Sequence, residues 1–171
     1  GIERFVDREE LDRFLRRVRF ASQHSAIVIP NDLLAAAVRR LAEGRSSFAQ
    51  LRDATKGGGL LAALQSQLPM REIDEVAPAF VTLPGRRRAR IEYHDGRPPS
   101  VASRLQDFFG MKETPSVARG TVPLVVQLLA PNQRPVQVTT DLVSFWKNLY
   151  PQVRRELSRR YPKHAWPEIP I

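Results

Sequence analysis

The chain of 171 residues has no cysteine and carries 27 Lys and Arg against 18 Asp and Glu, a formal net charge of +9. Its hydrophobic fraction of 42% is enough for a folded core, so we expect one domain or two small ones. Without cysteine there can be no disulfide, thiolate metal site or cysteine nucleophile. Without a secretory signal or 18 consecutive apolar residues, we expect a cytoplasmic protein with no membrane partner. The chain begins with Gly rather than Met, so we expect either a segment cut from a longer protein or a chain from which a tag has been trimmed.

The first part of the sequence, residues 1–78, predicts a small helical subdomain, because apolar residues recur at helical spacing. Candidate N-caps precede three of the helices: Asp7, with Glu10 completing a capping box, Asn31, and either Ser46 or Ser47. Gly44 is the expected stop of the second helix. Leucines between 60 and 68 predict a fourth helix that ends near Pro69, and residues 73–76 predict one or two more helical turns before Pro78.

The second part, residues 79–171, predicts two β-hairpins in an antiparallel sheet, each followed by a helix, so the fold class is α+β. Residues 80–83 form the first expected strand. Residues 88–93 alternate, with Ala89, Ile91 and Tyr93 facing the core. After a turn at Asp95-Gly96, we expect Ser100 to cap a helix that runs through Leu105, Phe108 and Phe109 to Gly110.

The second hairpin is expected to start with an interior strand, because residues 124–129 are apolar on both faces. A turn at Pro131-Asn132 leads to a return strand over 136–139, and Thr140 or Asp141 then caps the last helix. Pro151 interrupts that helix, which predicts a kink or a second helix with Pro151 in its first turn. Its apolar face is expected to hold Leu142, Trp146, Leu149, Val153 and Leu157.

The sequence contains no arrangement that favours an independent enzyme. His24, His94 and His164 are not at metal-ligand spacing, and Glu92 with His94 fits a surface strand end better than a catalytic pair. The glycines after Lys56 do not form a phosphate loop, because there the lysine must follow the glycines. We therefore expect no catalytic residue, metal or cofactor site in this chain.

The basic residues are concentrated in the second half. Residues 1–85 hold 12 basic and 11 acidic residues, and residues 86–171 hold 15 and 7. This asymmetry favours a polyanionic partner, with nucleic acid the commonest, although compositional bias explains why 23 of the basic residues are arginine. The candidate nucleic-acid contacts lie on the predicted hairpin and on the last helix and tail: Arg86, Arg87, Arg88, Arg90, Arg97, Arg154, Arg155, Arg159, Arg160, Tyr161, Lys163, His164 and Trp166.

Each candidate group has a structural alternative. The hairpin arginines are also typical of a solvated strand face. In the tail, Tyr161 and Trp166 either stack on unpaired bases or pack back onto the body of the domain. Phe145 and Trp146 are expected in the core rather than in a binding platform.

Several stretches then carry a family resemblance. They are Pro98-Pro99, residues 104–110, Val122-Pro123-Leu124, residues 134–139, Asp141-Leu142, Phe145-Trp146, residues 160–164 and Trp166-Pro167. In order and spacing they resemble the C-terminal region of the HrpB family of bacterial DExH-box ATP-dependent RNA helicases.

That resemblance implies two RecA-like motor lobes outside this chain, and ATP and Mg²⁺ are expected on those lobes. The implied role of the chain itself is that of a non-catalytic accessory domain. Its expected partners are RNA, most simply single-stranded, and the motor domains of the same protein. The alternative is a structural or protein-interaction module that binds no nucleic acid.

Overall fold

The computed structural model describes residues 7–55, 58–85 and 87–171. The chain divides into two compact units, Gly1–Ala77 and Pro78–Ile171, where the sequence had suggested a division between residues 78 and 79. We call them the helical unit and the α+β unit. No helix in the described ranges is long and apolar enough to cross a membrane.

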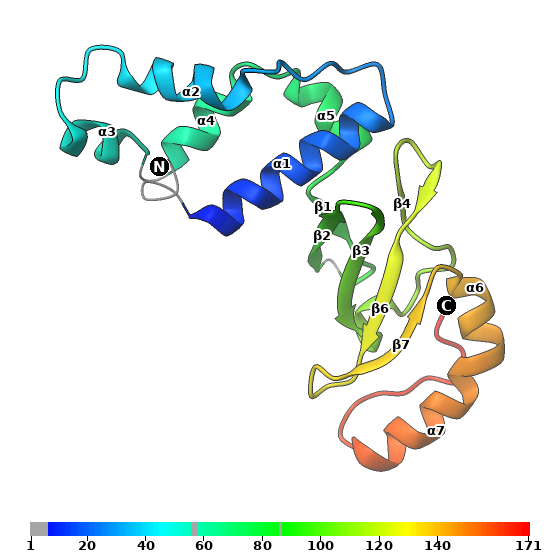
Figure 1. Ribbon diagram of the computed structural model, residues 1–171. Coiled ribbons are helices and arrows are strands. Elements are labelled where there is room, and N and C mark those ends of the chain that lie inside the picture. The colour runs from blue at the N-terminus through cyan, green and yellow to red at the C-terminus, as the bar shows by residue number, and fades with distance from the viewer. Residues whose placement is uncertain (1–6, 56–57, 86) are drawn as a thin grey trace. The chain divides into compact units, whose positions relative to one another are not determined.

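In its described residues, 7–55 and 58–77, the helical unit contains five helices (Figure 1): α1 (Arg8–Gln23), α2 (Leu33–Ala42), α3 (Phe48–Thr55), α4 (Gly59–Gln65) and α5 (Met70–Val76). The cap at Asp7 is confirmed, because its carboxylate accepts hydrogen bonds from the backbone N–H groups of Glu9 (3.0 Å) and Glu10 (3.4 Å). Ser47 likewise accepts from Gln50 N–H (3.2 Å) at the start of α3. Gly44, after α2, has the left-handed φ of 71° typical of a helix stop.

The expected cap at Asn31 is wrong. The carbonyl of Pro30 accepts a hydrogen bond from Leu33 N–H (3.2 Å), so Asn31 lies inside a turn and Asp32 becomes the residue before α2. The Asp32 carboxylate does not cap the helix but pairs with Arg39 (3.1 Å) on the helix surface. The local pattern thus located the helix but placed its cap one residue early.

The α+β unit is built on a five-stranded sheet with the order β1-β2-β3-β6-β7. Its strands are β1 (Phe80–Thr82), β2 (Arg88–His94), β3 (Arg97–Arg104), β6 (Val125–Leu129) and β7 (Pro135–Thr139), and β4 (Ser116–Val117) pairs with β5 (Val122–Pro123) separately. The expected antiparallel pairing is confirmed within each hairpin, but β3 and β6 run parallel at the centre. The long connection between β3 and β6 makes that parallel crossover possible.

The expected helix capped by Ser100 is also wrong. Ser100 lies within β3, opposite Val125 of β6, and its hydroxyl is 3.0 Å from Nε2 of His94. The backbone around Ser100 pairs with β2 on one side and with β6 on the other, so it cannot form the expected helix. Only one 3-10 turn, η3 (Leu105–Phe108), follows β3.

Alternate residues of the strands face the core of the α+β unit, as the sequence predicted. Ala89, Ile91 and Tyr93 of β2 are buried, and the Tyr93 hydroxyl donates to the carbonyl of Pro78 (2.6 Å). Val126 of β6 is completely buried, in agreement with an interior strand.

The last helical run lies on the β7 side of the sheet (Figure 1) and has three parts: α6 (Leu142–Ser144), a π-helical turn η4 (Phe145–Leu149) and α7 (Tyr150–Arg160). Asp141 caps it by accepting from Ser144 N–H (3.0 Å), and the hydrogen bonds from Ser144 lower the pKa of the Asp141 carboxyl. Pro151 lies in the first turn of α7, as predicted. The π turn adds a residue, so Tyr150 points inward and Leu149, expected on the apolar face, is 44% exposed.

Candidate nucleic-acid interface

Most of the predicted contact residues fall into two groups within the α+β unit. Arg87, Arg88 and Arg90 belong to β2 and the loop before it, near the β1 edge of the sheet, whereas the candidates of α7 and the tail lie toward the opposite, β7 edge. Arg86 lies outside the described residues. The two basic segments that the sequence indicated therefore lie toward opposite edges of the sheet.

The group at the β1 edge is centred on an aromatic side chain. Phe80 of β1 is 38% exposed, and the guanidinium carbon of Arg88 lies 4.2 Å from the centre of its ring. Arg90, paired with Phe80 across the strands, is at 5.8 Å. These cation–π contacts hold two exposed cations beside one apolar ring. We call Phe80, Arg88 and Arg90 the Phe80 cluster.

Two further hairpin candidates have polar partners. A guanidinium nitrogen of Arg87 lies 3.8 Å from Asp107, whose side chain is 11% exposed and also pairs with Arg104 (3.4 Å). Arg97 lies on the β2–β3 hairpin, with its guanidinium 3.3 Å from Nδ1 of His94. Part of the positive charge of Arg87 is thus offset inside the unit.

The arginines of α7 point in different directions. Arg154 is half-buried and donates from Nε to the carbonyl of Trp166 (2.7 Å). Arg155 and Arg159 are exposed one turn apart, and Arg159 donates to the carbonyl of Arg155 (3.3 Å). Arg160 lies on another side of α7 and lines a pocket. Arg154 therefore ties the tail to the helix, and the other three remain at the surface.

The tail corrects the expectation for Trp166. Its ring is 7% exposed and packs edge-on to Phe109, with centroids 6.4 Å apart, and Nε1–H donates to the carbonyl of Tyr161 (2.9 Å). A buried indole cannot stack on a base, so the alternative that the tail packs onto the body holds for this residue. Tyr161 is half-buried, and Lys163 and His164 are exposed.

Further hydrogen bonds fix the path of the tail. The Tyr150 hydroxyl donates to the carbonyl of Pro167 (2.6 Å), and Gly110 N–H donates to that of Pro170 (2.5 Å). Burial raises the pKa of Tyr150, and the nearby charge of Arg154 opposes this shift. The tail is thus an ordered segment that positions Tyr161 at the end of α7.

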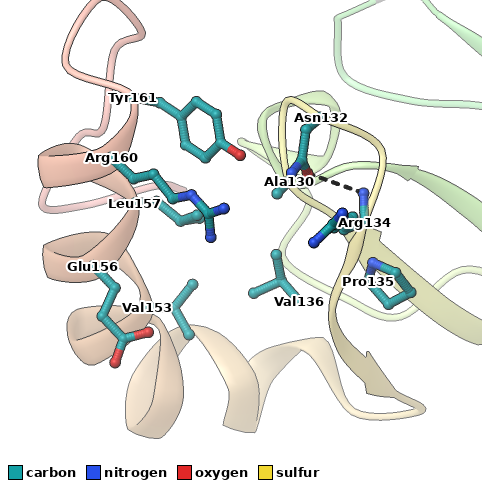
Figure 2. A pocket seen from close by; sticks show the side chains of 10 residues that line it. All are labelled: Ala130, Asn132, Arg134, Pro135, Val136, Val153, Glu156, Leu157, Arg160 and Tyr161. Carbon is teal, nitrogen blue, oxygen red and sulfur yellow. Dashed lines mark hydrogen bonds between the residues drawn. The ribbon is translucent and has the colours of Figure 1, made fainter.

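A pocket of about 300 Å³ lies between the β6–β7 turn and α7 (Figure 2), a volume at the lower end for ligand sites. We call it the β7–α7 pocket. It is lined by Ala130, Asn132, Arg134, Pro135, Val136, Val153, Glu156, Leu157, Arg160 and Tyr161. Arg160 and Tyr161 extend into it from the end of α7, and Arg134 extends from the opposite side (Figure 2).

The β6–β7 turn holds Arg134 in place. The side-chain oxygen of Asn132 accepts from Arg134 N–H (3.1 Å), and the Arg134 carbonyl accepts from Ala130 N–H (2.9 Å). Gln133 has a left-handed φ of 69°, which completes the tight turn. Sequence reasoning treated this segment only as a turn and missed Arg134 and Asn132, because their proximity to α7 depends on the folded sheet.

Comparison with known proteins identifies the family of the chain. The chain belongs to the ATP-dependent helicase C-terminal family (HrpB_C), which matches residues 38–170, and this confirms the resemblance inferred from the sequence. It is similar to the ATP-dependent RNA helicase HrpB of Escherichia coli (strain K12), with 47% identity over 100 residues, 58% of this chain and 12% of that protein.

Two solved structures are similar as well. The E. coli DExH-box NTPase HrpB matches with a TM-score of 0.79 and 34% identity, over 93% of this chain and 20% of that one. The E. coli DEAH/RHA helicase HrpB matches with a TM-score of 0.66 and 32% identity, over 91% and 20%. The chain therefore spans a fifth or less of the relatives it matches.

Proposed function

We propose that this chain is a non-catalytic accessory region of an ATP-dependent RNA helicase and that its α+β unit holds single-stranded RNA. ATP and Mg²⁺ would then bind to motor domains outside this chain, in the cytoplasm. Family membership supports the accessory role, and the charge of the α+β unit supports the RNA contact. Residues 78–171 hold 15 basic and 7 acidic residues, a net charge of +8. Single-stranded RNA suits these two basic surfaces, because its phosphates can contact the arginines while its bases stack on exposed or half-buried aromatic rings.

The observation that carries this proposal is a set of exposed arginines without acidic partners. Within the described residues, no ion pair involves Arg88 or Arg90 of the Phe80 cluster, nor Arg134 or Arg160 of the β7–α7 pocket. All four are exposed. Guanidinium groups recognise phosphate through planar, paired N–H donors, so this set fits a phosphate backbone.

The experiment is a binding titration of the whole chain with a short fluorescein-labelled oligouridylate, repeated from about 50 to 200 mM salt. We expect affinity to fall with salt by about 0.7 log units per contacted phosphate and per log unit of salt. The double variant Arg88→Gln/Arg90→Gln should weaken binding. The charge-matched control Lys112→Gln/Lys147→Gln, which changes two exposed lysines of the same unit, should change it less. No binding at the lowest salt would contradict the proposal.

A second candidate function is docking on the motor or on another protein. It is favoured by exposed aliphatic side chains in the same unit, among them Val138 of β7 and Val143 of α6. The uncharged variant Val138→Ser/Val143→Ser separates the two functions. Docking predicts that it changes the ATPase activity of the whole helicase, whereas RNA holding alone predicts that both the ATPase activity and the RNA affinity keep their wild-type values.

A further inference from the structure

We propose that the β7–α7 pocket binds one nucleotide of a single RNA strand, with its phosphate between Arg134 and Arg160 and its base against Tyr161. This inference rests on the proposed function and makes it specific to one site. It follows from the convergence of two cations, one aromatic ring and an apolar floor on a single space.

The two halves of the pocket are held by separate hydrogen-bonded structures. On one side, Asn132 and Ala130 fix the backbone of Arg134 at both its N–H and its carbonyl. On the other side, the Tyr161 carbonyl accepts from the buried Trp166, and Tyr161 N–H donates to Leu157 (2.7 Å). The site thus has its backbone arranged before a ligand arrives, which lowers the entropy lost on binding.

The electrostatics of the pocket favour an anion. Among the described residues, neither Arg134 nor Arg160 forms an ion pair, although both guanidinium groups line the same space. Glu156 also lines the pocket and lies one helical turn before Arg160, yet the two do not pair. Figure 2 shows its carboxylate apart from the Arg160 guanidinium. A phosphate between the two arginines would remove their mutual repulsion and add charge-assisted hydrogen bonds.

The remaining surfaces of the pocket suit a base. Val136 of β7 and Val153 and Leu157 of α7 form an apolar floor below Tyr161. The guanidinium carbon of Arg160 lies 5.8 Å from the centre of the Tyr161 ring, so cation and ring are side by side. Asn132 uses its side-chain oxygen within the turn, which leaves the amide NH₂ as a donor at the rim. An aromatic ring beside a phosphate-binding cation is the usual arrangement for an unpaired nucleotide.

The surroundings favour a strand over a free nucleotide. Arg159 precedes Arg160 in the chain and Lys163 follows Tyr161, and both are exposed. A free nucleotide leaves these cations unused, whereas neighbouring phosphates of a strand can reach them. The strand therefore gains contacts that a mononucleotide lacks.

The test measures binding of oligouridylate and of uridine monophosphate to the whole chain. Arg134→Gln/Arg160→Gln should lower oligouridylate affinity about fivefold at 100 mM salt and make the salt slope shallower by about 0.7, the value for one phosphate. Tyr161→Ala should lower affinity at least about fivefold at every salt concentration, and Tyr161→Phe should retain it, because stacking needs the ring and not the hydroxyl. The control is again Lys112→Gln/Lys147→Gln, and thermal unfolding verifies that each variant is folded.

A second readout locates the contact directly. Oligouridylate that carries 5-iodouridine should photo-crosslink to Tyr161, and mass spectrometry should identify that residue in the wild type. Excess uridine monophosphate should compete only weakly.

The outcomes separate this inference from the proposed function. If the pocket variants bind like the control and Arg88→Gln/Arg90→Gln does not, RNA holding stands and the pocket assignment is overturned. If the wild type binds no oligouridylate, both fail. If uridine monophosphate binds as tightly as the oligonucleotide, the pocket serves a free nucleotide and the assignment to a strand is wrong.

Discussion

The helical unit and the α+β unit carry similar numbers of basic residues but surround them differently. Residues 1–77 balance 12 basic with 11 acidic residues. Arg17, whose side chain is 13% exposed, pairs with Asp74 and donates from Nε to the carbonyl of Ala77 (2.6 Å). Arg39 pairs with Asp32 at the surface (3.1 Å). Arginine in this unit connects helices and neutralises carboxylates.

In the α+β unit the same residue type has few acidic partners. Asp107 pairs with Arg87 and Arg104, whereas the exposed arginines of the Phe80 cluster and the β7–α7 pocket have no ion pair among the described residues. The local supply of carboxylates, more than the number of arginines, therefore decides whether a basic unit stabilises itself or presents charge to a partner.

The largest expected effect separates the structural part of the tail from its binding part. Trp166→Ala should destabilise the α+β unit by about 3–5 kcal/mol, because a buried indole and its hydrogen bond to Tyr161 are lost. Urea denaturation followed by the fluorescence of Trp146, the other tryptophan, measures this. Ile169→Ala, at an exposed position of the same tail, is the control and should stay within about 0.5 kcal/mol of wild type. A Trp166→Ala protein as stable as wild type would contradict the anchoring role.

The next prediction concerns arginine pairing in the helical unit. Asp74→Asn should cost about 1–2 kcal/mol, because Arg17 is largely buried and hydrogen bonds to charged groups are stronger than neutral ones. Asp32→Asn breaks a pair exposed on both sides and should cost about 0.5 kcal/mol or less. Urea denaturation measures both values. RNA affinity should be the same in both variants, and a clear change would mean that the helical unit also contacts RNA.

Tyr150 gives a test with a pH dependence. Tyr150→Phe should cost about 1 kcal/mol near neutral pH, since the hydrogen bond to Pro167 is lost. Burial raises the pKa of Tyr150 above its ordinary value of 10.0, so the unfolded chain loses this proton at a lower pH than the folded one. The stabilisation is fully present below pH 10.0 and is lost as pH rises through the folded pKa. The urea midpoints of the wild type and of Tyr150→Phe should therefore converge as the pH rises above 10.0. A difference between the two midpoints that widens over this range would contradict the prediction.

The smallest expected effect is a gain of binding. Asp107→Asn removes the carboxylate beside Arg87 and should strengthen oligouridylate binding roughly two- to fivefold, the equivalent of about 0.4–1 kcal/mol. Glu113→Gln, at an exposed position of the same unit, removes the same charge and serves as the control. Equal effects of the two variants would indicate that only total charge matters. A gain confined to Asp107→Asn would show that the loop at Arg87 faces the strand.

Local patterns in the sequence predicted the features that depend on neighbouring residues. Asp7 and Asp141 cap their helices, β2 alternates, and Pro151 begins α7, because each depends on a few adjacent side chains. The sequence did not predict the parallel pairing of β3 with β6, which depends on strands far apart in the chain. It placed Ser100 at a helix start for the same reason.

The candidate site likewise combines residues that the local sequence predicts with residues that come together only in the folded sheet. Exposed arginines of β2 and α7 were found from composition and periodicity alone. Arg134 was missed, because it approaches Arg160 only after β7 has paired with β6 and α7 has packed beside it. Trp166 was included among the contacts because sequence shows an aromatic residue between basic ones but does not show its burial.

The most direct test of the difference between the two units compares two triple variants in the oligouridylate salt series. Arg88→Gln/Arg90→Gln/Arg160→Gln changes the α+β unit, and Arg39→Gln/Arg40→Gln/Arg71→Gln removes three exposed charges from the helical unit. We expect the first variant to make the salt slope shallower by about 1.4–2.1, the value for two or three phosphates, and the second to leave the slope unchanged. Equal slopes for the two variants would contradict the claim that the α+β unit holds the RNA.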